Sequence, residues 1–464
     1  MPARSVSSPS VLAQGTAFAR AGVRPGALVL AVAIPIVFLH VRYQPKVHVG
    51  LGSTTAGIEL SDVAVLAVAL AALWTGAREG WAPLRAGRAL WIAGAAFVAM
   101  VVAATFYGLA RPEHYHFLTH LVTAAKFAEY AVLAPAVPLL LRARRDAALL
   151  LWTIAAWSAA ATAWGLLQFS GLVNEFEGKR PLQREPSFLG IHDLAALSGT
   201  ALAIGLALLA LRSHTQGERL LGWVAGASGA LGLVLSSAVA GALGIVLAAG
   251  AVILVGARRH VLTLARAASI VTIAVVVGAG VLLMRSGDVT SFIRFLGIGH
   301  EPKKTADVES SVHRSLLAYI GARIFADHPI LGVGWQGSEE QDNYRPYLAA
   351  AHRRFPGEPE VAFPSPKHAW GVQNAYLQTL TDMGLVGFAL LVALFVCGLV
   401  LGLRAALRGP PELALVALVG VCWMLVAAGV WNGLGLVAGI PLDAVTWLSF
   451  GLIAAAAAAR AARA

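Results

Sequence analysis

The sequence predicts an all-α polytopic membrane protein with about twelve transmembrane helices and one long external loop. Three observations predict this class. Of the 464 residues, 58 % are hydrophobic and only 13 % are charged, against roughly 25 % charged in a soluble domain. Apolar runs of about 20 residues, the length that spans a bilayer, recur along the chain. The basic residues fall mainly on alternate connecting segments. This composition excludes a disordered chain, a nucleic-acid-binding domain and a cytosolic enzyme.

Twelve apolar segments are candidates for spanning helices. They lie near residues 26–41, 58–76, 89–110, 118–141, 147–169, 188–211, 220–235, 239–256, 267–284, 376–402, 412–433 and 441–459. The first follows three arginines, as in a signal peptide, but no small-residue cleavage site follows it, so we interpret it as a retained helix. The seventh and eighth are separated only by small residues around Ser236 and Ser237. One long kinked helix is therefore an alternative for that pair.

The distribution of Lys and Arg predicts the orientation of these spans. If both termini are cytoplasmic, the cytoplasmic segments hold 18 of the 35 basic residues and the short external loops hold six. Every cytoplasmic segment is then basic, as the positive-inside rule requires. The long connection of residues 285–375 is external and carries ten more basic residues. We expect spans one to nine in 1–284, a periplasmic loop domain in 285–375, and spans ten to twelve in 376–464.

The long loop contains a predicted amphipathic helix. Residues 310–325 read SSVHRSLLAYIGARIF, with apolar side chains at helical spacing, and Pro329 bars their continuation. We expect this helix to lie on the outer membrane surface, with Arg314 and Arg323 near the headgroups. From this pattern alone the arginines either snorkel without a chemical role or take part in function. Next comes DHPILGVGWQG, which has the GxGxxG spacing; without a βαβ unit it indicates a turn close to the membrane rather than a dinucleotide site.

The remaining patterns give no cofactor or metal site. The sequence has no HExxH, CxxC, DxD or P-loop motif. Its two cysteines lie in apolar runs and are expected to pack rather than to form a disulfide.

Four charged residues fall within or at the edges of predicted spans. Lys126 and Glu129 share one face of the fourth span, so we expect them to pair with each other or to face the bundle interior; a packing role and an ion or substrate role both remain open. Asp62 and Asp193 fit the N-termini of their helices. The role of His192, beside Asp193, is left open.

Three motifs occur in order across the long loop and the next span. HRSLLAYIGARIFADHPILGVG is followed by a polar insert and then by QNAYLQTLTDMGLVGF. This set resembles the O-antigen ligase and O-antigen polymerase superfamily, in which a loop arginine, a Pro-x-x-Gly-x-Gly turn, a His-Asn pair and a Gly-x-x-Gly follow one another. The twelve-span layout, the position of the long loop and the ELSD at the start of the second span are also similar. The resemblance is close over about 310–390 and rests on topology elsewhere.

The resemblance implies a GT-C-like glycosyltransferase of the inner membrane. Such enzymes move a glycan from undecaprenyl diphosphate to an acceptor hydroxyl, either on the lipid A core (ligase) or on another repeat unit (polymerase), with inversion and without a metal. The implied partners are this lipid-linked donor, the lipid A core or glycan acceptor, and the lipid bilayer, with no nucleic acid. Guanidinium groups suit the diphosphate leaving group, and a base near the acceptor hydroxyl aids its attack.

The family's arginines carry over to positions on the predicted external face. Arg314 matches the loop arginine. A second family arginine precedes span six, and here QREPSFLGIHDLAAL matches loosely, which makes Arg184 the carry-over and Arg180 its fallback. The Ser-Arg that often begins a middle span in the family is missing, because the segment here reads SSAVAGALG.

The family's histidine is the main departure. Gln373 occupies its position and cannot act as a base near neutral pH, whereas Asn374 fits the pair. We assign Gln373 and Asn374 to acceptor positioning. His368, five residues earlier, is the candidate base, and His313 is another candidate near the substrate. Because many polymerase-like members of the superfamily do not keep this histidine, its absence favours a polymerase over a strict ligase.

Two other functional classes remain open. A transporter or flippase suits twelve spans with Lys126 and Glu129 inside them, but the polar residues are concentrated in one external loop. A peptidoglycan polymerase of the shape, elongation and division family has fewer spans. Sixteen basic residues on external segments run against the positive-inside bias, and an anionic diphosphate donor explains them.

Overall fold

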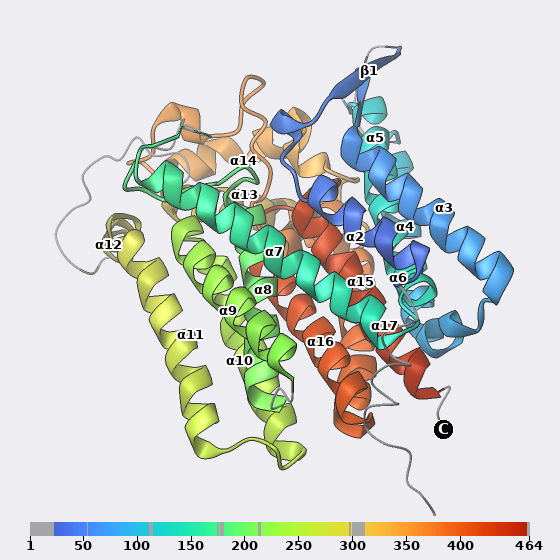
Figure 1. The fold of residues 1–464 in the computed structure, drawn as a ribbon. Coiled ribbons are helices and arrows are strands. Elements are labelled where there is room, and N and C mark those ends of the chain that lie inside the picture. Colours follow the sequence, from blue (N-terminus) through green and yellow to red (C-terminus); the bar gives the residue numbers. More distant parts are fainter. Residues whose placement is uncertain are drawn as a thin grey trace, which may run out of the picture.

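The computed structural model describes residues 23–52, 54–110, 115–173, 176, 181–211, 215–296, 298 and 311–461. These residues form a bundle of long helices with shorter elements gathered at one end (Figure 1). Ten of the described helices are long and apolar enough to cross a membrane, which confirms the all-α polytopic class. They are α3 (Leu60–Glu79), α4 (Arg88–Gly108, preceded by η2, Ala82–Gly87), α7 (Arg144–Phe169), α8 (Ile191–Leu211), α9 (Gln216–Ser236), α10 (Val239–Arg258), α11 (Leu264–Met284), α15 (Ala375–Arg408), α16 (Pro411–Trp431) and α17 (Pro441–Ala461).

The other two predicted spans coincide with shorter helices. The first is α2 (Pro25–Val37), which has 13 residues. The fourth is divided into α5 (Phe117–Ala131) and α6 (Leu133–Leu140). The seventh and eighth are two separate helices, because Ser237 adopts a left-handed conformation (φ 49°) between α9 and α10. The kinked-helix alternative is therefore wrong.

Small residues let the central helices approach closely. Within their most apolar windows, α8, α16 and α17 have 83, 72 and 89 % of residues buried, against 22 % for α11. Helices α8, α16 and α17 thus form the centre of the bundle, and α11 lies at its edge (Figure 1). Gly244 of α10 meets Gly429 of α16 backbone to backbone, a contact typical of helices packed in membranes.

A short β-hairpin that the sequence analysis did not anticipate precedes α3. β1 (Lys46–Leu51) pairs antiparallel with β2 (Thr54–Glu59). Glu59 and Asp62 then form a capping box at the start of α3, as the position of Asp62 predicts. Lys126 Nζ lies 3.3 Å from Asp62 Oδ2 and 3.7 Å from Glu59 Oε2. From the sequence, Lys126 is expected to pair with Glu129 or to face the bundle interior; its described ion-pair partners are instead the two carboxylates that cap α3.

The long loop folds into several elements between α11 and α15. These are α12 (Ser286–Phe295), α13 (Ser311–Asp327), η3 (Gly337–Glu339), α14 (Gln341–Arg354) and η4 (Glu360–Ala362), and they lie at the hairpin end of the bundle (Figure 1). The predicted helix is α13, but its apolar face packs against protein instead of being left for the membrane surface. Leu316, Ile320 and Ile324 are buried against side chains of the same loop such as Tyr344 and Phe355. The polar insert supplies these partners, so protein rather than lipid covers the apolar face.

The glycine-rich turn after α13 packs into a break in α15. Gly384 has a left-handed φ of 63° that interrupts the helix. The Leu385 amide donates to the Pro329 carbonyl at 2.8 Å, and the Val333 amide donates to the Thr381 carbonyl at 2.9 Å. Backbone groups released by the break are thus bonded to the turn, as the interior of a membrane protein requires. The two glycine motifs, 332–337 and 384–387, therefore belong to segments that pack against each other.

Candidate functional site

Arg314 joins three parts of the chain at the hairpin end of the bundle. It lies in the first turn of α13 and is half-buried. Its Nε donates to Gln373 Oε1 at 3.2 Å, and its Nη2 lies 3.4 Å from His192 Nε2 in the first turn of α8. Its Nη1 lies beside Gly433, just after α16. A cationic group is thus fixed where the loop meets three central parts of the bundle.

Asn374 links the start of α15 to the end of α16. Its side-chain oxygen caps α15 by accepting from the amides of Tyr376 (3.1 Å) and Leu377 (3.0 Å). Its side-chain nitrogen donates to the Oδ1 (2.8 Å) and backbone oxygen (3.2 Å) of Asn432 at the end of α16. The carboxamide is therefore fully used in protein contacts, and it fixes the residue before it, Gln373, beside Arg314.

Arg184 lies in the segment that connects α7 to α8, also at the hairpin end. The amide of the next residue, Glu185, donates to the Leu235 carbonyl at 2.9 Å, close to the end of α9. This segment leads directly into the first turn of α8, which carries His192. Arg180, the fallback for Arg184, lies outside the described residues.

The two histidines predicted from the loop both contact Trp370. His313 is completely buried, bonds the Ala362 carbonyl through Nε2 at 3.0 Å, and meets Trp370 edge to face at 5.4 Å. His368 is exposed on a tight turn and stacks on Trp370 at 6.0 Å. Their described contacts belong to the core and rim of the loop region, whereas Gln373 contacts Arg314.

His192 is the functional candidate that the sequence left open. A guanidinium group only donates hydrogen bonds, so Nε2 of His192 is the acceptor in its contact with Arg314 and carries no proton there. The only signal in the sequence was its position eight residues after Arg184, at the start of the same span. The contact with Arg314 joins residues 122 positions apart, which no local pattern reveals.

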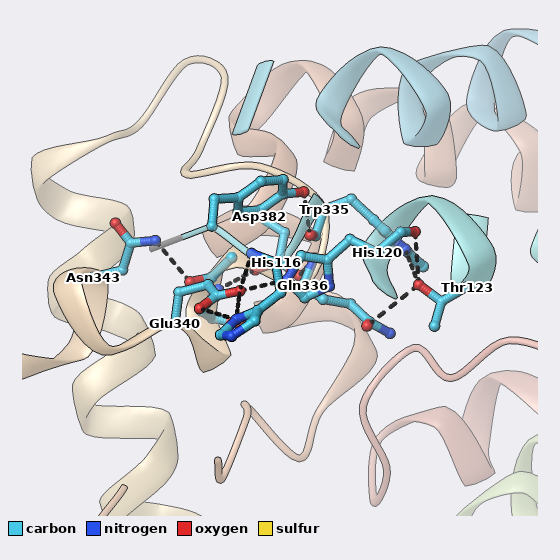
Figure 2. Close-up of polar contacts among 11 residues, drawn as sticks. His116, His120, Thr123, Trp335, Gln336, Glu340, Asn343 and Asp382 are labelled. Carbon is cyan, nitrogen blue, oxygen red and sulfur yellow. Dashed lines mark hydrogen bonds and ion pairs between the residues drawn. The ribbon is translucent and has the colours of Figure 1, made fainter. Parts of the chain in front are cut away.

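A buried polar cluster holds the glycine-rich turn in place (Figure 2). Asp382 of α15 accepts from the amides of Gln336 (3.0 Å) and Ser338 (3.1 Å). Glu340 accepts from His120 Nε2 at 2.6 Å and from the side chain and amide of His116, each at 3.0 Å. Burial opposes ionisation of Glu340, yet the bonds from His120 and His116 hold its pKa below the usual range. The cluster therefore ties the loop to both α5 and α15.

Glu339 lies next to this cluster in a different electrostatic environment. Burial, with the nearby charges of Asp382 and Glu340, raises its pKa to about 8. Its carboxylate packs directly against Gly371, which leaves no room there for a Cβ atom. Glu339 thus approaches the segment that leads to Gln373 from the side of the turn.

The comparison with known families covers one part of this site. Residues 224–392 match the model of the O-antigen ligase family, a range that includes Arg314, Gln373, Asn374 and the break in α15. No curated protein matches the chain. The match confirms, for this part of the chain, the expected resemblance to the O-antigen ligase and polymerase superfamily.

Proposed function

We propose that this protein is an inner-membrane glycosyltransferase that moves a glycan from undecaprenyl diphosphate to an acceptor hydroxyl. The observation that carries the proposal is the position of Arg314, half-buried between Gln373 and His192 at one end of a membrane-type bundle. A diphosphate attached to a membrane lipid is an anion that a fixed guanidinium group at such a boundary binds well.

Arg314 and Arg184 have the same proposed role, which is to stabilise the leaving diphosphate. As the acceptor oxygen attacks the anomeric carbon, the bond from that carbon to the diphosphate oxygen breaks and negative charge collects on the diphosphate. A preorganised guanidinium group is worth most at this stage, because its charge needs no reorganisation. Attack from the face opposite the leaving group inverts the anomeric centre.

The proposed orientation puts this site on the periplasmic face and both termini in the cytoplasm. The basic connections that the positive-inside rule assigns to the cytoplasm meet at the other end of the bundle. There Arg144 pairs with Glu218 at 2.6 Å, and Arg259 donates to the Gly409 carbonyl at 2.8 Å. Residues 285–375 then form the periplasmic loop domain.

The acceptor of the ligase reaction is the lipid A core; for a polymerase it is another repeat unit. Gln373 favours the polymerase alternative, because it replaces the family's histidine and is bonded to Arg314. Lys126 contacts the cap of α3 at the hairpin end rather than an ion path through the bundle, which counts against a transporter. The sequence indicates His368 as the base, and the groups that contact Arg314 are the other candidates.

Transfer by the purified protein tests this proposal. The protein is placed in lipid nanodiscs, without an ion gradient, with an undecaprenyl-diphosphate glycan and either lipid A core or a second lipid-linked unit. Arg314→Ala should lower the transfer rate by about 100-fold or more. Arg323→Ala is the matched control, because Arg323 lies on the same helix, is exposed and contacts Tyr319. A single addition to lipid A core indicates a ligase, and a ladder indicates a polymerase.

A further inference from the structure

We propose that His192 accepts the proton of the acceptor hydroxyl during glycan transfer. This inference rests on the proposed function and adds a catalytic residue to it. Its starting point is the contact between His192 Nε2 and Arg314 Nη2 at 3.4 Å.

The contact places His192 beside the reacting atoms. If Arg314 binds the diphosphate, the anomeric carbon is bonded to an oxygen of that same diphosphate. A group within hydrogen-bonding reach of the guanidinium is then a few ångströms from the carbon under attack. In-line attack requires that the anomeric carbon lie between the diphosphate and the acceptor hydroxyl, with the imidazole beside the carbon and reaching the hydroxyl on its far side.

His192 is also in the chemical form that a base requires. The guanidinium group has no lone pair to offer, so Nε2 faces it with an unprotonated lone pair. Bound diphosphate competes for the donors of Arg314, because charge-assisted bonds to phosphate are stronger than a bond to a neutral ring. When the diphosphate binds, Arg314 therefore releases Nε2 of His192, and its lone pair can accept a hydrogen bond from the acceptor hydroxyl.

The backbone around His192 is rigid, which keeps the imidazole in position. The Leu194 amide donates to the Gly190 carbonyl at 2.8 Å and begins α8. Asp193, the next residue, accepts from the Leu442 amide at 3.0 Å and ties this turn to the start of α17. His192 itself is half-buried, so the site combines restricted motion with access.

The other candidate bases are less well placed. His313 is completely buried and bonded to the Ala362 carbonyl. His368 is exposed and stacked on Trp370. Glu339 reaches the site only through Gly371, and with a pKa of about 8 it is mostly protonated at neutral pH. Gln373 cannot take up a proton.

The proposed step balances as follows. Nε2 takes the hydroxyl proton while the acceptor oxygen forms its bond to the anomeric carbon. The bond from that carbon to the diphosphate breaks, and its electron pair leaves with undecaprenyl diphosphate. The imidazolium formed is stabilised by the diphosphate charge until the products leave, when its proton passes to water.

The test uses the full-length protein in nanodiscs with the undecaprenyl-diphosphate glycan and acceptor described above. His192→Gln keeps a hydrogen-bond acceptor for Arg314 but cannot take a proton. We expect kcat to fall about 10²- to 10⁴-fold, with KM for the donor within about threefold of wild type because uniform donor binding is retained. His352→Gln is the matched control, since His352 stacks on Phe363 in the loop region.

Chemical rescue separates a catalytic role from a structural one. His192→Ala should regain part of its rate when free imidazole is added, and Arg314→Ala should not. Wild-type transfer together with an unchanged kcat in His192→Gln would overturn this inference and leave the proposed function intact; a loss without imidazole rescue would also overturn it. No transfer by the wild-type protein would instead contradict the proposed function.

Discussion

Arg314 Nε donates to Gln373 Oε1 at 3.2 Å, so two residues that the sequence motifs predict for the site are in direct contact. The contact joins α13 to the residue before the cap of α15 across 59 positions in the sequence. Gln373 is neutral, and it therefore orients the guanidinium group without adding a negative charge. A neutral partner of this kind competes less with an anionic ligand than a carboxylate would.

A negative charge at position 373 should weaken the binding of the diphosphate donor. Gln373→Glu places a carboxylate against Arg314, and the resulting ion pair competes with the diphosphate. We expect the donor KM to rise about tenfold or more, while Gln373→Ala changes it much less. Initial transfer rates against donor concentration measure the effect. Equal donor KM values in Gln373→Glu and wild type would show that Arg314 does not bind the diphosphate.

The break in α15 should depend on Gly384. Its φ of 63° disfavours any other residue, and a Cβ atom would meet the Ile330 carbonyl. Gly384→Ala should therefore destabilise the fold by about 1–3 kcal/mol, seen as a lower midpoint of thermal unfolding in detergent. Gly278→Ala in α11 is the control, because nothing lies within 4 Å of its Cβ position. The prediction is wrong if the two variants unfold at the same temperature.

Acid should loosen the contact between Glu340 and the two histidines of α5. The pKa of Glu340 is lowered in the folded protein, so its stabilising contribution is complete above the unfolded pKa of about 4.3. It is lost as the pH falls through the still lower folded value. We expect lower protection of the amides of 335–340 under these acidic conditions, measured relative to the intrinsic exchange rate at the same pH, and Glu340→Gln to show that lower protection already at neutral pH. Glu360→Gln, at an exposed site, should exchange like wild type; slow exchange in Glu340→Gln would count against this role.

Alkaline pH should act on Glu339 in the opposite direction. Its pKa is raised to about 8 by burial and by neighbouring carboxylates. The folded state thus holds the proton more tightly than the unfolded state, and stability falls as the pH rises from about 4.3 through 8. Glu339→Gln should remove this decline and raise stability at pH 9 by roughly 1–3 kcal/mol, a value reduced by the remaining solvent contact. Parallel pH profiles of thermal unfolding for the two proteins would contradict it.

The sequence predicted the helices far better than their contacts. Runs of apolar residues located all ten described helices that are long enough to cross a membrane, because bilayer thickness sets their length independently of tertiary packing. Arg314 and the glycine turn were predicted from motifs that occur in a fixed order. The ion-pair partners of Lys126 were not predicted, because Asp62 and Glu59 lie at the start of a different helix. His192 was undecided for the same reason: its chemistry depends on Arg314, which only the folded chain brings to it.

Transfer of glycans from undecaprenyl diphosphate is proposed to depend on Arg314. The most direct test measures the initial rate at which glycan appears on the acceptor and undecaprenyl diphosphate is released, for wild type, Arg314→Ala and Arg323→Ala in nanodiscs. We expect equal amounts of both products, a loss of about 100-fold or more in Arg314→Ala, and near-wild-type rates in Arg323→Ala. Transfer by Arg314→Ala at the wild-type rate, or no transfer by the wild-type protein, would contradict the claim.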